Sequence, residues 1–161
     1  MFKDSYNIVI VGGGSTWTPG ILKALTKHKD KLALKKVVLY DIDEERQSYI
    51  GEFGKILFKE EYPEVDFSYT TVKEEAYKDV DFVFCQMRTG GYPMREKDEH
   101  IPLSLGVIGQ ETCGPGGFAY GIRSIKDMVE MVQDVRKYSP DAWILNYTNP
   151  AAIVAYALKK V

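Results

Sequence analysis

The chain has 161 residues and a formal net charge of -2, a length that suits one domain with a substantial core. Lysine and arginine are interspersed with aspartate and glutamate, so no basic stripe indicates a nucleic-acid partner. We expect neither a membrane span nor a secretory signal peptide, because no apolar run is long enough. Cys85 and Cys113 lack zinc-binding spacing, and cysteines kept as thiols favour a cytoplasmic location.

Short apolar runs alternate along the chain with segments of helical spacing. Strands are expected at 7–11, 36–40, 66–70, 82–86 and 143–147. Helices are expected at about 19–28, 43–60, 72–77 and 122–138, and from 151 onward, with Thr18 capping the first of them. Residues 88–117 are rich in Gly and Pro and are expected to form a long irregular connection. The alternation predicts an α/β fold with a Rossmann-like, doubly wound parallel sheet.

A glycine cluster follows the first expected strand and opens the first expected helix. Glycines there allow a tight turn and let a diphosphate approach the main chain, and the helix start offers unpaired N–H groups. The candidate cofactor-binding residues of this turn are Gly12, Gly13, Gly14, Ser15 and Thr16. Trp17 occupies the third glycine position of the G-x-G-x-x-G pattern, which leaves a tight turn without a ligand as the alternative.

Asp41 ends the second expected strand, where an acid can accept hydrogen bonds from the adenosine ribose hydroxyls. An acid at this place favours NAD over its 2′-phosphorylated relative. The strand, the glycine turn and the acid together predict an NAD site.

Polar residues of the 88–117 segment follow the carboxyl end of a strand, the edge at which open α/β sheets bind ligands. Arg88 and Arg95 are candidates for binding an anionic group, and ion pairing with Glu96, Asp98 or Glu99 is the alternative. Glu111 could tune a neighbouring acid or base, or cap a helix.

Asn149 precedes Pro150, which biases the asparagine toward an extended backbone. Its amide suits a sugar hydroxyl, and a turn-forming asparagine is the alternative. His100 has no partner at metal-ligand spacing, so no metal site is expected within the chain.

Three separated motifs in order, GGGSTWTPG at 12–20, MREKDEHIPLSLGVIGQETCGPGG at 94–117 and SPDAWILNYTNPAAIVA at 139–155, resemble family 4 of the glycoside hydrolases. The resemblance implies a cytoplasmic 6-phospho-glycosidase that depends on NAD and a divalent metal, with manganese the metal we expect. It also implies a fold similar to the N-terminal domain of lactate and malate dehydrogenases. The second and third motifs are most similar to the branch that acts on α-linked substrates such as maltose 6′-phosphate, and the choice between α and β linkage stays open.

The resemblance implies hydrolysis of a 6-phosphorylated disaccharide through transient oxidation at C3 of the sugar, deprotonation at C2, and elimination followed by addition of water. Arg95 and Asn149 match substrate-binding positions, and Arg88 is a substrate-binding candidate that would line the same cleft with Met87. Glu111 matches a position that raises the basicity of a catalytic tyrosine. The family's metal ligands, acid and base follow the asparagine–proline motif. Residues 1–161 are therefore expected to be an NAD-binding domain that lacks the catalytic and metal-binding domain and is inactive alone.

Two other functions fit parts of the pattern: an NAD-dependent 2-hydroxy acid dehydrogenase domain of the lactate/malate type, and a non-catalytic nucleotide-binding fragment. A sheet that ends after the fifth expected strand leaves an edge uncovered, and such edges pair with other chains. We therefore expect a homo-oligomer, with no nucleic-acid or membrane partner.

Overall fold

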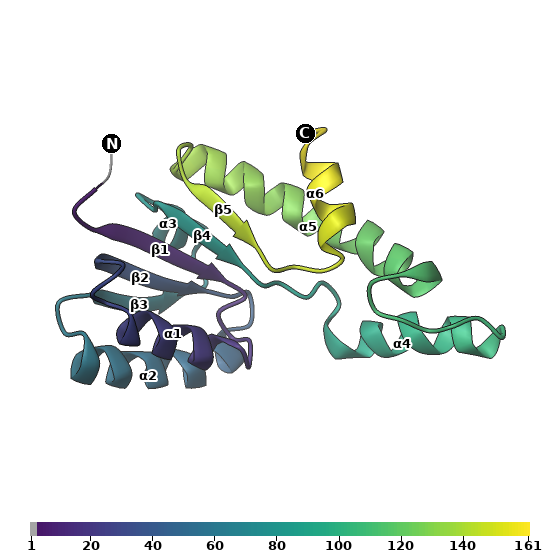
Figure 1. Ribbon diagram of the computed structural model, residues 1–161, viewed down its shortest axis with the longest axis horizontal. Helices are drawn as coiled ribbons and strands as arrows, with labels where there is room; N and C mark the ends of the chain where they lie inside the picture. The colour runs from purple at the N-terminus through teal and green to yellow at the C-terminus, as the bar shows by residue number, and fades with distance from the viewer. Residues whose placement is uncertain (1–2) are drawn as a thin grey trace. The chain divides into compact units, whose positions relative to one another are not determined.

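A computed structural model describes residues 3–161 and contains one parallel sheet of five strands in the order β3-β2-β1-β4-β5 (Figure 1). The strands are β1 Tyr6–Val11, β2 Leu34–Tyr40, β3 Asp66–Thr70, β4 Phe82–Cys85 and β5 Trp143–Asn146. The helices are α1 Thr18–Lys27, α2 Glu44–Glu61, α3 Lys73–Tyr77, α4 Gly91–Ser104, α5 Gly114–Tyr138 and α6 Ala151–Leu158. None of the helices described has both the length and the hydropathy that a bilayer span requires.

The chain forms two compact units. The first comprises Met1–Gln86 with Asp134–Leu145, and the second comprises Met87–Gln133 with Asn146–Val161. The first unit carries β1–β4 and helices α1–α3, and the second carries α4, α6 and most of α5.

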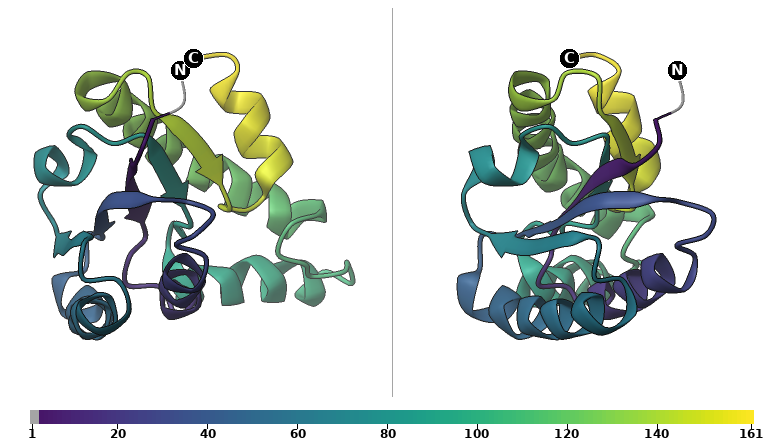
Figure 2. Two further views of the ribbon diagram at one scale, coloured as in Figure 1. Left: turned by 60° about the vertical axis from the view of Figure 1, so that its left-hand side comes forward. Right: turned by 90° about the vertical axis from the view of Figure 1, so that its left-hand side faces the viewer.

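The centre of the first unit is β1, which pairs in parallel with β2 on one side and β4 on the other. Ile8, Val9 and Ile10 have no exposed surface because helices cover both faces, with α1 and α2 on one face and α3 on the other (Figures 1 and 2). Strands buried on both faces read as continuous apolar runs, which explains why the sequence located them. The order of the strands confirms the predicted doubly wound, Rossmann-like α/β fold.

Helix α2 lies very close to β3 because two of its inward positions are glycines. A Cβ atom added at Gly54 would stand 2.1 Å from Cζ of Phe67, and one added at Gly51 would stand 2.2 Å from Cδ1 of Tyr69. The Phe67 ring stacks on buried Phe58 of the same helix at 4.9 Å between centroids. The glycines thus make room for the aromatic side of β3.

Two expectations about the helices are wrong. Thr18 does not cap α1: Trp17 is the cap residue, and Thr18 is buried in the first turn. Residues 88–117 are mostly helical rather than irregular, since they contain α4 and the first turn of α5.

The sequence pattern did not predict helix α4. Its buried residues are a charged residue and a proline, Asp98 and Pro102, while Ile101 and Leu103 are exposed. The sequence of α4 therefore shows no apolar stripe of helical period. The glycines that suggested a loop instead permit close packing: a Cβ atom at Gly116, in α5, would stand 2.3 Å from the carbonyl oxygen of Asp98. Tertiary contacts therefore determine the secondary structure of this segment.

Substituting Gly54→Ala tests the fit of α2 on β3. We expect a loss of about 1–3 kcal/mol in the free energy of unfolding, because the new methyl group overlaps the Phe67 ring and outweighs the gain in helix propensity. Gly20→Ala in α1 is the matched control, since a Cβ atom there meets nothing within 4 Å. Urea unfolding of both variants measures the difference, and equal stability would contradict the close fit.

Candidate functional site

The glycine turn of the first unit is built on the carboxyl ends of β1 and β2. Gly12 has φ +85°, and the N–H groups of Gly12 and Gly13 both donate to the carbonyl oxygen of Tyr40 at 2.9 Å. A Cβ atom at Gly13 would stand 2.7 Å from both Cβ of Leu39 and Oε1 of buried Gln47. The main chain therefore carries no side chain at these glycines, which leaves it bare for the close approach of a diphosphate.

Asp41 is tied directly to this turn. Its Oδ2 accepts a hydrogen bond from the N–H of Gly14 at 2.8 Å, and its Oδ1 accepts one from the N–H of Asp43 at 3.1 Å. A carboxylate has about four lone-pair sites, so acceptor capacity remains for two ribose hydroxyls. The predicted turn and the predicted ribose acid thus lie side by side.

The start of α1 leaves a donor available for an anion. The N–H of Trp17 donates to Oγ of Ser15 at 3.3 Å and that of Thr18 to the Ser15 carbonyl at 3.0 Å. The N–H of Thr16 has no hydrogen-bond partner within residues 3–161. An unpaired N–H at a helix N-terminus is the usual feature of a phosphate site.

The sequence missed Gln86, which follows β4 and stabilises the turn. Its Nε2 donates to Oγ1 of Thr18 at 2.8 Å and to the carbonyl oxygen of Gly12 at 3.3 Å. The available signal was a polar residue directly after a buried strand, at the ligand-binding edge of the sheet.

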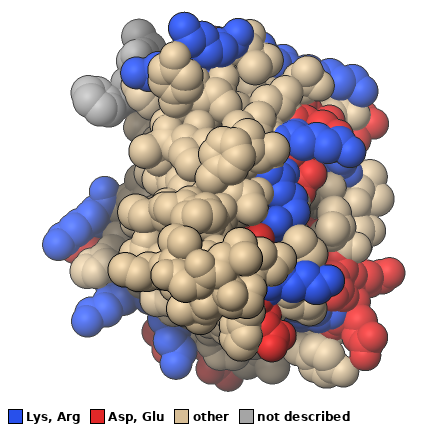
Figure 3. Space-filling model, turned by 90° about the vertical axis from the view of Figure 1, so that its right-hand side faces the viewer, with Lys and Arg blue, Asp and Glu red and all other residues tan. Residues whose placement is uncertain are grey.

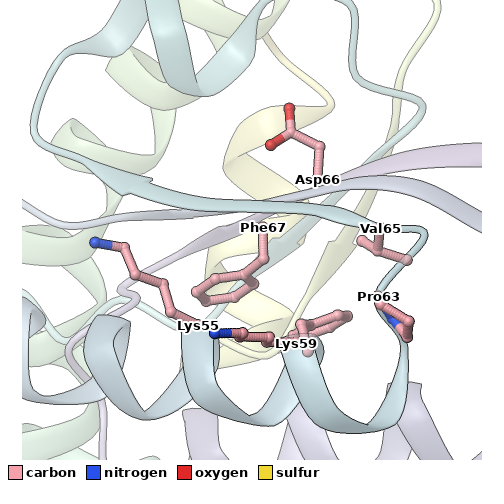
Figure 4. A pocket seen from close by; sticks show the side chains of 7 residues that line it. Lys55, Lys59, Pro63, Val65, Asp66 and Phe67 are labelled. Atoms are coloured by element: carbon pink, nitrogen blue, oxygen red, sulfur yellow. The ribbon is translucent and has the colours of Figure 1, made fainter.

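Two of the hollows on the surface of the described residues belong to the first unit. One of about 310 Å³ is lined by Asp43, Glu45, Arg46 and Tyr49, at the start of α2 and close in sequence to Asp41. The other, of about 300 Å³, lies between the end of α2 and β3, where Lys55 and Lys59 flank the Phe67 ring (Figure 4). In that view Asp66 points away from α2, so the second hollow contains no converging polar groups and reflects helix packing.

The second unit brings three predicted residues together. Oε1 of Glu111 lies 2.7 Å from an Nη atom of Arg88, and Oε2 lies 3.4 Å from an Nη atom of Arg95. Nε of Arg95 also donates to Oε1 of Glu99 at 2.9 Å. The hydrogen bond to Glu99 and the charge of Glu111 raise the pKa of Arg95, which keeps its positive charge fixed.

Of the ion pairs considered from the sequence, one is present and another is not. Pairing of Arg95 with Glu99 was one of the alternatives from sequence, whereas Asp98 pairs with neither Arg88 nor Arg95 and binds Arg123 instead. Both carboxylate oxygens of Glu111 face guanidinium groups.

Asn149 is exposed in the second unit, before the Asn149–Pro150 cis peptide bond. The contacts of the described residues do not join it to Arg88, Arg95 or Glu111. The glycine turn and Asp41 belong to the first unit, and the arginines and Asn149 to the second.

Within residues 3–161, no group of three or more His, Cys, Asp and Glu side chains could hold a metal ion. His100 and Cys113 are exposed and belong to no such group.

The fold is that of a Rossmann-like α/β domain, and the glycine turn with Asp41 beside it is typical of the dinucleotide-binding class. The model of the family described as "Family 4 glycosyl hydrolase" matches residues 7–161. The chain belongs to family 4 of the glycosyl hydrolases.

Its relatives include the maltose-6′-phosphate glucosidase of Fusobacterium mortiferum, 54% identical over 97% of this chain and 35% of that protein. A probable 6-phospho-beta-glucosidase of Bacillus subtilis is 41% identical over 94% of this chain and 35% of its own length. The chain thus spans about 35% of the length of the relatives it matches.

Among solved structures, a 6-phospho-alpha-glucosidase from gut microorganisms in complex with NAD and Mn²⁺ has a TM-score of 0.96 and 64% identity, covering 98% of this chain and 36% of that one. A second, in complex with NAD and glucose-6-phosphate, has a TM-score of 0.92 and 49% identity with the same coverage. A malate dehydrogenase from Naegleria fowleri, at 12% identity and a TM-score of 0.68, shares the fold alone.

The contacts among Arg88, Arg95, Glu99 and Glu111 form an arginine cluster. Substituting Glu111→Gln tests how much this cluster stabilises the fold. We expect the free energy of unfolding to fall by about 1–2 kcal/mol, because two guanidinium groups lose a shared counter-charge that is only partly exposed. Glu96→Gln, an exposed residue of α4, is the control and should change stability by less than about 0.5 kcal/mol. Equal denaturation curves for the two variants would contradict a stabilising role for Glu111.

Proposed function

We propose that the chain is the NAD-binding domain of a family 4 6-phospho-glycosidase, and that it acts on α-linked 6-phosphorylated disaccharides. The observation that carries the proposal is the hydrogen bond between Asp41 and Gly14. That bond sets the ribose acceptor beside the phosphate-binding turn, which is the spacing that one dinucleotide requires.

The residues present fit NAD. The diphosphate would lie against the main chain of Gly12, Gly13 and Gly14, with the N–H of Thr16 and the hydroxyls of Ser15 and Thr16 as its donors, and Asp41 would accept from the ribose hydroxyls. The charge of Asp41 would repel a 2′-phosphate, which favours NAD over the phosphorylated cofactor. The hollow lined by Arg46 and Tyr49 offers space for the adenine end.

The sugar would be bound by Arg88, Arg95 and Asn149. The two guanidinium groups donate hydrogen bonds without changing charge, and the amide of Asn149 both donates and accepts, which suits sugar hydroxyls. Glu111 would hold the two arginines in a fixed orientation and, as the family resemblance implies, raise the basicity of the catalytic base. NAD, when bound, supplies a hydride acceptor and donor for the C3 position of the sugar.

The α linkage is favoured by identity, which is 54% to a maltose-6′-phosphate glucosidase and 41% to a probable 6-phospho-beta-glucosidase. A complex of a 6-phospho-alpha-glucosidase with glucose-6-phosphate supports a 6-phosphorylated sugar as substrate. We place the protein in the cytoplasm, since Cys85 and Cys113 form no disulfide.

Manganese does not fit the described residues, which offer no cluster of ligands. The family resemblance implies that the metal ligands, the acid and the base of the reaction follow the asparagine–proline motif, and this chain covers about 35% of the length of its relatives. On this proposal the 161-residue chain binds NAD but does not hydrolyse glycosides.

Calorimetric titration with NAD tests the proposal. Asp41→Asn keeps an oxygen that can accept from Gly14 but removes the charge and one acceptor, so we expect NAD to bind about tenfold more weakly and its preference over NADP to shrink. Glu60→Gln is the control, because it removes one negative charge at an exposed position near the other end of α2. A folded wild-type chain that binds no NAD, or an Asp41→Asn variant with unchanged affinity, would refute the assignment.

We also propose that the chain self-associates. Large apolar side chains are exposed at the end of α4 and in the loop after it, namely Ile101, Leu103, Leu105, Val107 and Ile108. Figure 3 shows a broad band of residues without charge, polar ones included, beside a flank of charged side chains. An apolar surface of this kind is typical of protein interfaces.

Sedimentation at micromolar concentrations measures the association. We expect a dimer or a larger species in the wild type, and a shift toward monomer when Leu105→Glu and Ile108→Glu are combined. A wild type that sediments as a monomer would contradict the proposal.

A further inference from the structure

Arg123, which the sequence motifs did not single out, uses its guanidinium group on three acceptors in the second unit. One Nη atom donates to Oδ1 of Asp98 at 3.2 Å and the other to Oδ2 at 2.5 Å. Its Nε donates to the carbonyl oxygen of Thr89 at 3.1 Å. The side chain of Asp98 is only 6% exposed, so this fork ties α5 both to α4 and to the connection after β4.

The same connection has a second tie to α5. Oγ1 of Thr89 donates to Oδ2 of Asp127 at 2.6 Å. The next residue, Gly90, has φ +86°, and a Cβ atom there would stand 3.1 Å from Nε of Arg123. The main chain directly after Arg88 is therefore fixed by two side chains of α5.

The ring of Tyr120 connects Arg123 to Arg88. Tyr120 is 3% exposed, and its ring centroid lies 5.6 Å from Cζ of Arg88 and 5.5 Å from Cζ of Arg123. The Arg88 guanidinium also lies 5.7 Å from the centroid of Tyr92. A planar guanidinium stacks well on aromatic faces, so these rings restrict where Arg88 can point.

Two positive groups share the Tyr120 ring because each pairs with a different carboxylate. Arg123 is neutralised by Asp98, and Arg88 by Glu111. Burying a paired charge costs desolvation energy, and an apolar contact between α4 and α5 would stabilise the fold as well. Unlike an apolar contact, the polar arrangement also gives Arg88 a defined orientation.

We propose that Arg123 and Tyr120 are positioning residues that hold the guanidinium of Arg88 in its substrate-binding orientation. The inference rests on the proposed function of Arg88 as a sugar ligand. Neither residue needs to touch the sugar.

The order of the Arg88 side chain is the direct readout, measured by ¹⁵N relaxation of its Nε–H group in the 161-residue chain. On the scale where rigid groups give order parameters near 0.85 and flexible ones below about 0.6, we expect Arg88 to move from the rigid to the flexible range in Arg123→Lys. Lysine keeps the charge toward Asp98 but lacks the fork and the Nε contact with Thr89. Arg136→Lys, at an exposed position of the same helix, should leave Arg88 unchanged.

A second pair of variants tests the ring. Tyr120→Leu should loosen Arg88, whereas Tyr120→Phe, which keeps the ring, should not. An Arg88 signal that stays rigid in folded Arg123→Lys or Tyr120→Leu would overturn the inference.

Titration of the NAD-loaded chain with glucose 6-phosphate separates this inference from the proposed function. If both hold, Arg123→Lys weakens binding of the sugar phosphate about tenfold while NAD affinity is unchanged. If the wild type binds no sugar phosphate but Arg123→Lys still loosens Arg88, the proposed role of Arg88 fails and the positioning role stands.

Discussion

The hydrogen bond from the N–H of Gly14 to Asp41 is the contact on which the cofactor end of the molecule depends. It links the turn after β1 to the residue after β2, two places that are 27 residues apart in sequence. Parallel pairing of β1 with β2 brings the two strand ends together, and the carboxylate then fixes their spacing. Bare backbone at Gly13 completes the arrangement, since any side chain there would displace Leu39 or Gln47.

The first unit was largely readable from sequence because its strands are buried on both faces and its helices carry apolar stripes. The residues 66–70 expected as a strand have the bounds of β3, and the predicted strands at 7–11 and 82–86 differ from β1 and β4 by one residue at one end. The acid and the glycine turn were also found, since each is defined by the element it follows. Gln86 was missed because its role depends on Thr18, far away in the chain.

The second unit was much harder to read. Helix α4 buries Asp98 and exposes Ile101, the reverse of the pattern that identifies a helix, and the buried carboxylate pairs with Arg123 in α5. Arg88, Arg95 and Glu111 were each recognised, but their contact could not be, because it depends on where α4 and the loop after it turn back. The residue types show which chemical groups are available, and the fold determines which of these groups come into contact.

The arginine cluster is electrically balanced. Arg88 and Arg95 contribute two positive charges, and Glu99 and Glu111 contribute two negative ones. A neutral cluster exerts little long-range pull on an anion, so its contacts with a ligand are short-range, directional hydrogen bonds that ionic strength barely weakens. At the start of α1 the N–H of Thr16 has no hydrogen-bond partner within residues 3–161, and the helix dipole there attracts an anion through a field that salt screens. Raising the ionic strength would therefore weaken the hold on an anion at the start of α1 more than the contacts within the arginine cluster.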